Sequence, residues 1–128
     1  MSYHPFADHI GLHVSDAGEN ESLCTLVAKD ELYNPHKVIH GGVLYSMADT
    51  GMGAALYPTL QEGEICATVE IKINYFKPVF GGEITCRTVI VNRGKTLANL
   101  ESEIWSDDIL VAKANGSYAI YPLPKIIP

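Results

Sequence analysis

The chain of 128 residues is long enough for one domain with one hydrophobic core, and 47% of its residues are apolar, as in ordinary globular proteins. No apolar run approaches the ~20 residues of a membrane-spanning helix, and the first residues lack the basic and apolar regions of a secretory signal. The formal net charge of −6, without a basic stripe, argues against nucleic-acid binding and gives no general attraction for anionic ligands.

The cysteines indicate a reducing environment. Cys24, Cys66 and Cys86 are odd in number and scattered through strand-like runs. This usage is typical of reduced, buried thiols rather than of a disulfide framework. We therefore expect a cytoplasmic protein with a single domain over residues 1–128, without internal repeats or linkers.

The first half of the chain predicts short elements followed by one helix. Residues 4–10 are expected to form a helical turn, and strand-like runs at 12–16 and 22–28 flank a hairpin turn at 18–20. Residues 29–37 are polar and turn-rich. A long helix is predicted over residues 42–57, before Pro58. One face of it carries small or apolar residues at spacings of three and four: Leu44, Met47, Ala48, Gly51, Met52 and Ala55.

The second half of the chain predicts β structure. Apolar odd-numbered residues alternate with mostly polar even-numbered ones over 65–76, which predicts a strand with two unlike faces. Further strands are expected at 83–91, 96–105 and 109–121, with turns between them and an irregular tail at 122–128. A hairpin, one helix and a four-strand meander make an α+β fold. Because one helix cannot cover six strands well, we expect another subunit to pair with the remaining face or edge.

The segment NPHKVIHGGVLYSMAD, residues 34–49, is the most informative part of the chain. Asn34 and His40 supply polar side chains in a turn. Gly41 and Gly42 open the helix and are expected to leave its first N–H groups without partners, which suits an oxyanion or a polarised carbonyl. Asp49 is the only charged residue between Lys37 and Glu62, and an isolated acid in an apolar helix is costly to bury without a role.

The spacing of these groups predicts a site made by two chains. Asp49 lies about two turns after Gly41, roughly 12 Å along the helix axis. Reacting atoms must come within ~3–3.5 Å of each other. If the Asp49 carboxylate and the Gly41 N–H act on one substrate, the carboxylate must therefore come from a second copy. A two-fold dimer with antiparallel helices would build such a site twice.

Together with the strand that ends in Asn74-Tyr75-Phe76-Lys77-Pro78, this segment resembles the hotdog-fold acyl-CoA thioesterases of the phenylacetic-acid-degradation type. The likeness covers about residues 10–121. It implies a hotdog fold, in which an antiparallel β-sheet wraps around one long central helix. It also implies a homodimer with edge-joined sheets, usually doubled to a homotetramer, and active sites at the dimer interface. The substrate would be an acyl-CoA, and no metal or organic cofactor is expected because coenzyme A is part of the substrate.

The resemblance also assigns roles to residues. The Gly41 amide would polarise the thioester carbonyl, and Asp49 of the facing subunit would act as nucleophile or general base. Asn34 and His40 would orient the carbonyl or the sulfur region, and Thr68 matches a position with a hydroxyl near the attacking water. The residues expected to bind the coenzyme A portion are Gly42, Lys77, Arg93 and Lys95, the last three because the chain has few cations.

Other interpretations remain open at this point. Asp49 could be a solvated helix acid, and Asn34 could only close a turn. A zinc site at His36 and His40 is disfavoured because Pro35 and the glycines place them in a turn without an HExxH pattern. No serine elbow, cysteine–histidine pair or phosphate loop is recognisable. The alternative functions are a non-catalytic hotdog module that binds acyl-CoA or acyl carrier protein, and a hotdog dehydratase that uses His40.

Overall fold

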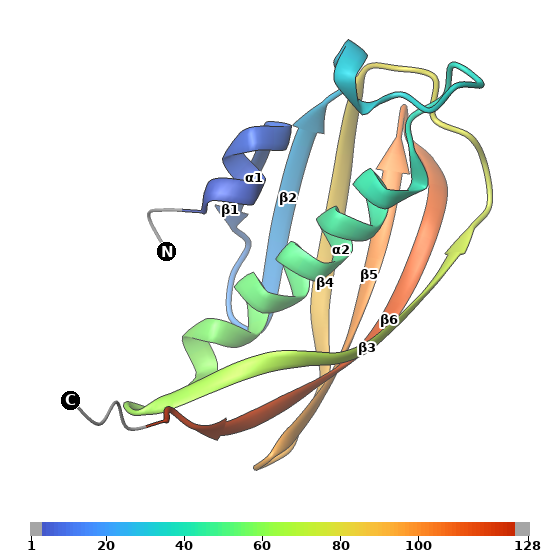
Figure 1. The fold of residues 1–128 in the computed structure, drawn as a ribbon. Helices are drawn as coiled ribbons and strands as arrows, with labels where there is room; N and C mark the ends of the chain where they lie inside the picture. Colours follow the sequence, from blue (N-terminus) through green and yellow to red (C-terminus); the bar gives the residue numbers. More distant parts are fainter. Residues whose placement is uncertain (1–3, 125–128) are drawn as a thin grey trace.

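The computed structural model describes residues 4–124, in which a curved antiparallel sheet of six strands wraps around one long helix (Figure 1). The helical elements are α1 (Pro5–Ile10), η1 (Asp30–Leu32), α2 (Gly41–Leu56) and η2 (Tyr57–Thr59). The strands are β1 (Leu12–Asp16), β2 (Glu21–Val27), β3 (Glu64–Tyr75), β4 (Glu83–Arg93), β5 (Leu97–Ser106) and β6 (Ile109–Pro122). The predicted α+β class is confirmed. The last strand extends to Pro122, and residues 125–128 of the predicted irregular tail lie outside the described range.

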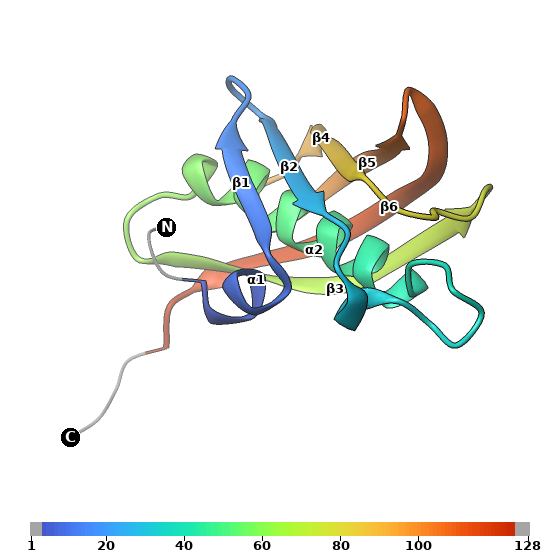
Figure 2. The same cartoon turned by 90° about the horizontal axis from the view of Figure 1, so that it is seen from above.

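The order of the strands differs from the predicted meander. The sheet runs β1-β2-β4-β5-β6-β3, so β3 pairs with β6 at the far edge and not with β4 (Figure 2). Tight turns join β4 to β5 and β5 to β6; Asp107 and Asp108 have positive φ angles of 50° and 63°, which suit a type I′ hairpin. The connection from β3 to β4 is longer and contains Pro78. No local turn therefore makes β3 and β4 neighbours.

The predicted apolar face of α2 is confirmed, because all six of its residues are buried against the sheet. Gly51 marks the closest approach. A Cβ at this position would lie 2.8 Å from the Thr88 hydroxyl of β4. Ser22 of β2 donates a hydrogen bond of 2.6 Å to the Gly51 carbonyl. Glycine is thus needed here because the helix backbone lies directly on the sheet.

A β-bulge interrupts the alternation predicted for β3. Thr68 is opposite Tyr118 of β6, whereas the next paired residue is Glu70, so Val69 is the extra residue. Directly opposite residues on paired strands point to the same face. Even-numbered Thr68 therefore points toward α2 before the bulge, and odd-numbered Ile71 points toward it afterwards. The prediction that one parity occupies one face throughout is wrong for this reason.

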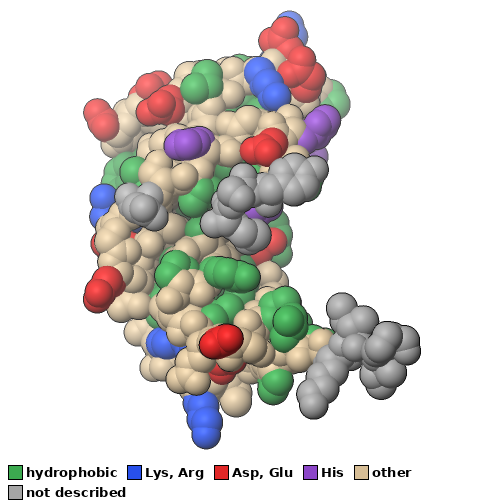
Figure 3. Space-filling view, turned by 90° about the vertical axis from the view of Figure 1, so that its left-hand side faces the viewer, with side chains coloured by type: hydrophobic (Ala, Val, Ile, Leu, Met, Phe, Trp, Pro, Cys, Tyr) green, Lys and Arg blue, Asp and Glu red, His purple; other side chains and the backbone are tan. Residues whose placement is uncertain are grey.

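The surface has few concentrated charges. On the face shown in Figure 3, Lys and Arg side chains stand singly and do not form a basic stripe. Within residues 4–124, no helix is both long and apolar enough to cross a membrane. Cys24 and Cys86 are buried on neighbouring strands, while Cys66 is only half-buried, and all three are free thiols.

Candidate functional site

The start of α2 is capped by His40. Its Nδ1 accepts a hydrogen bond of 2.8 Å from the Gly42 N–H, and its carbonyl accepts one of 2.9 Å from the Val43 N–H. The expectation that both glycines leave bare N–H groups is therefore wrong for Gly42. Gly41 is the first residue of the helix, so its N–H has no partner within the helix. Because Nδ1 accepts this bond, Nε2 is the ring nitrogen of His40 that is available to a ligand.

Tyr75, at the end of β3, packs on this glycine. Its hydroxyl donates a hydrogen bond of 2.8 Å to the Gly41 carbonyl. A Cβ at Gly41 would lie 3.2 Å from the Tyr75 ring, so the ring occupies the space that a side chain would need. Burial raises the pKa of Tyr75, which keeps the hydroxyl protonated as a donor. This contact was not predicted, although Tyr75 belongs to the run at the end of the predicted strand.

The Asp49 carboxylate is held by two hydroxyl groups. Thr68 donates to Oδ1 over 2.8 Å, and Tyr118 of β6 donates to the same oxygen over 2.5 Å. The Tyr118 hydroxyl also lies 2.9 Å from the Asp49 carbonyl. The Asp49 side chain is half-buried, and no hydrogen bond to Oδ2 is formed from residues 4–124. One carboxylate oxygen is thus fixed and the other is available.

Tyr118 is a site residue that the sequence analysis missed. On β6 it follows Ala112, Ala114 and Gly116 at intervals of two, so it shares their face of the strand. The three small residues leave room for α2; a Cβ at Gly116, for example, would run into the Met52 side chain. The sequence does carry a pattern that could have pointed to Tyr118. It is the first long side chain after the small residues on this face of β6, and so the first that can reach a polar group on the helix.

Asn34 closes the turn that leads to the site. Its Oδ1 accepts hydrogen bonds from the N–H groups of His36, at 2.8 Å, and Val38, at 3.4 Å. Its own N–H donates to the Val38 carbonyl over 2.8 Å. The turn therefore uses Oδ1 of the Asn34 side chain. The Nδ2 group of the same side chain is the one that would contact a ligand.

The three cations chosen from the sequence have different surroundings. Lys77 is exposed and lines a cleft together with Gly41. Arg93 binds Thr59, with its Nε 2.9 Å from the hydroxyl, and lies 3.8 Å from the Glu64 carboxylate. Lys95 is exposed in the turn after β4. Lys77 is thus the one of the three that the structure places beside the helix start.

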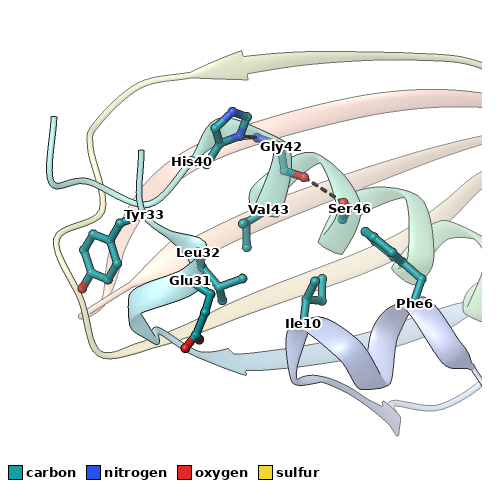
Figure 4. A pocket seen from close by; sticks show the side chains of 9 residues that line it. All are labelled: Phe6, Ile10, Glu31, Leu32, Tyr33, His40, Gly42, Val43 and Ser46. Carbon is teal, nitrogen blue, oxygen red and sulfur yellow. Dashed lines mark hydrogen bonds between the residues drawn. The ribbon is translucent and has the colours of Figure 1, made fainter. Parts of the chain in front are cut away.

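Two clefts flank the start of α2. The first has a volume of about 350 Å³ and lies between α1, η1 and α2 (Figure 4). Its apolar walls come from Phe6, Ile10, Leu32 and Val43, with His40 at its edge. The second, of about 320 Å³, contains Gly41 and Tyr75. An apolar group could therefore approach the helix start from either side.

A curved antiparallel sheet that encloses a single long helix defines the hotdog fold, and α2 of this chain carries a half-buried acid, Asp49, and begins at Gly41. The sequence profile of the thioesterase superfamily matches residues 36–113, more than half of the chain, and the chain belongs to this superfamily.

Individual relatives agree with this assignment. The acyl-coenzyme A thioesterase PaaI of Escherichia coli is 26% identical over 99 residues, which cover 77% of this chain and 69% of the relative. The structure of the conserved protein PA5202 of Pseudomonas aeruginosa superposes with a TM-score of 0.88 at 30% identity, covering 93% of this chain and 95% of the other. The thioesterase HI1161 of Haemophilus influenzae gives a TM-score of 0.88 at 25% identity, covering 94% and 85%.

These comparisons confirm two predictions from the sequence. The resemblance to hotdog thioesterases of the phenylacetic-acid-degradation type is confirmed by the family match and by relatives that carry the PaaI name. The expected class of enzyme, a thioester hydrolase, is confirmed with it.

Proposed function

We propose that the protein hydrolyses acyl-CoA thioesters, with Asp49 of one subunit acting on a carbonyl held by the Gly41 N–H of another. Water adds to the carbonyl carbon, the carbon–sulfur bond breaks, and the products are a carboxylic acid and the CoA thiol. The observation that carries this proposal is the half-buried Asp49 carboxylate, which has one oxygen fixed by two hydroxyls and the other available. Asp49 acts directly as nucleophile or as the base for the water.

The second subunit is proposed to pair along β3. This strand is twelve residues long and forms an edge of the sheet, and a long open edge readily accepts another strand. Val69, Tyr75 and Phe76 on or beside it are at least half exposed. Because Thr68 of the same strand holds Asp49, pairing along β3 would bring the carboxylate close to the partner. Two such dimers would make the proposed tetramer, and the three free thiols support a cytoplasmic setting.

Replacement of the acid tests the reaction. In Asp49→Asn we expect kcat for acyl-CoA hydrolysis to fall by about 100-fold or more, because the amide can neither attack nor accept a proton. Asp108→Asn is a matched control, since Asp108 is an exposed turn residue with positive φ that Asn accommodates. Release of free CoA thiol is followed with a chromogenic disulfide. Near-normal turnover of Asp49→Asn would refute the proposed role.

The role of the Gly41 amide is tested by a pair of variants. Gly41→Pro removes the N–H at the first position of the helix, where proline is well tolerated, and Gly41→Ala keeps it. Both add the Cβ that meets the Tyr75 ring. We expect kcat of Gly41→Pro to be about 100-fold below that of Gly41→Ala. Equal activities would show that this donor does not contact the carbonyl in the transition state.

Subunit mixing tests whether the site is shared. Gly41→Pro and Asp49→Asn chains are unfolded together, refolded and assayed. Random pairing makes half of the dimers mixed. If Gly41 and Asp49 of one site come from different chains, each mixed dimer has one intact site out of two. About a quarter of the wild-type activity should therefore return. If both groups came from one chain, no mixed dimer would contain an intact site and activity would stay absent.

Binding of the coenzyme A portion is proposed to involve Gly42, Lys77, Arg93 and Lys95, whereas Asn34 and His40 orient the carbonyl or the sulfur region. Lys77→Ala should raise KM for acyl-CoA more than KM for a short thioester without the nucleotide. The acyl group is then identified with a panel of aryl, phenylacetyl and fatty acyl-CoA substrates. Thiol release supports hydrolysis, a change in enoyl absorbance would instead support a dehydratase, and tight binding with neither would support a sensor.

A further inference from the structure

We infer that Tyr118 is a positioning residue for Asp49, an inference that rests on the proposed thioesterase mechanism. Its hydroxyl lies 2.5 Å from Oδ1 and 2.9 Å from the backbone carbonyl of the same residue. The tyrosine is 3% exposed, so its ring cannot move aside without displacing core side chains. Tyr118 thus joins a strand of the core to the acid on the helix, and its buried side chain leaves little surface for a ligand.

The β-bulge brings a second hydroxyl to the same oxygen. Thr68 and Tyr118 are directly opposite each other on β3 and β6. Because Val69 is an extra residue, Thr68 points toward α2 in the same way as Ile71 and the odd-numbered residues that follow it on β3. Both hydroxyls then donate to Oδ1. Since an oxygen with two donors is a weaker base and nucleophile, Oδ2 becomes the reacting oxygen, and the two hydroxyls determine the direction in which it points.

The electrostatic surroundings keep Tyr118 a donor. Burial raises the pKa of Tyr118 far above its ordinary value, and the hydrogen bond to Asp49 adds to this effect. Burial also raises the pKa of Cys66, the other titratable side chain that faces this region from β3. Both groups therefore remain neutral well above neutral pH. A hydrogen bond to a charged carboxylate is about twice as strong as one between neutral groups, which favours the fixed geometry.

Tyr118→Phe removes the hydroxyl and keeps the ring. We expect kcat to fall about 10- to 100-fold while KM changes less than about two-fold, because a poorly oriented carboxylate loses rate without losing substrate contacts. The acid limb of the pH–kcat profile should also move to higher pH, since the phenol donates to the ionised carboxylate. A purely structural tyrosine would not move this limb.

Ser102→Ala provides a matched control. Ser102 is fully buried and shares a hydrogen bond of 2.6 Å with the Thr88 hydroxyl, beneath α2 and away from Asp49. Both variants lose a hydrogen bond made by a buried hydroxyl group, so both should lose some thermal stability. Only Tyr118→Phe should lose kcat and shift the pH profile when the two are assayed well below their melting temperatures.

The outcomes separate the two proposals. If wild type releases thiol, Asp49→Asn does not, and Tyr118→Phe matches wild type in kcat and pH profile, then the inference about Tyr118 is wrong and the thioesterase proposal stands. An equal loss of kcat in Ser102→Ala would also overturn it, because the effect would then be one of packing. If wild type releases no thiol from any substrate, both proposals are refuted.

Discussion

Gly51→Ala provides a quantitative test of how closely α2 lies on the sheet. In a helix interior the change from glycine to alanine usually stabilises by about 1 kcal/mol. At Gly51 the new Cβ would lie 2.8 Å from the Thr88 hydroxyl and 3.4 Å from the Ser22 hydroxyl. Neither of these side chains is long enough to move its polar atom away without a change of rotamer.

The size of the effect follows from the buried hydrogen bonds. Rotation of Thr88 would break its 2.6 Å bond to Ser102, and a buried hydroxyl left without a partner costs about 1–3 kcal/mol. If Thr88 does not rotate, overpacking costs about the same. After subtraction of the helix-propensity gain, the net loss lies in a range of roughly 0–2 kcal/mol. We expect about 1 kcal/mol, which corresponds to a decrease in Tm of roughly 4 °C.

The assay is urea unfolding followed by far-UV circular dichroism at one fixed protein concentration, because association changes apparent stability. Gly53→Ala is the control on the same helix, since a Cβ there has no neighbour within 4 Å in the protomer. In the Thr88→Ala background the clashing hydroxyl is absent, so Gly51→Ala should cost less stability there than it does in wild type. Equal or greater stability of Gly51→Ala relative to wild type would refute the packing argument.

Three further predictions concern groups around the site. Burial raises the pKa of Cys24 to about 12 and that of Cys86 to about 11. As the pH rises, these thiols lose their protons in the unfolded chain before they do so in the folded protein, so the free energy of unfolding should fall above about pH 9. The fall should be smaller in Cys24→Ala. His40→Ala should lose about 1 kcal/mol of stability because the cap of α2 is missing. His40→Asn, which can cap the helix, should keep the stability of wild type in thermal unfolding. An unchanged melting temperature in both variants would contradict the capping role. Arg93→Met should speed hydrogen exchange around Thr59, to which Arg93 donates two hydrogen bonds, and unchanged exchange would show that they do not hold this segment.

Local patterns of the sequence determined the elements and the family. Periodicity of three and four gave the buried face of α2, and turn residues gave the hairpins between β4, β5 and β6. Both depend on neighbours within a few residues, which is why they can be read without a structure. The same segment contained the acid and the glycines, and their spacing along one helix was enough to predict that the site needs a second chain.

The tertiary structure alone decided what surrounds the acid. The position of β3 beside β6 and the bulge at Val69 are results of pairing between distant segments, and no local pattern specifies them. This pairing places Thr68 and Tyr118, fifty residues apart in the chain, on one carboxylate oxygen. It likewise places Tyr75 on Gly41. The sequence therefore singled out the groups that we propose to react, whereas the groups that hold them in place depend on sheet register, which is determined only when the whole core packs.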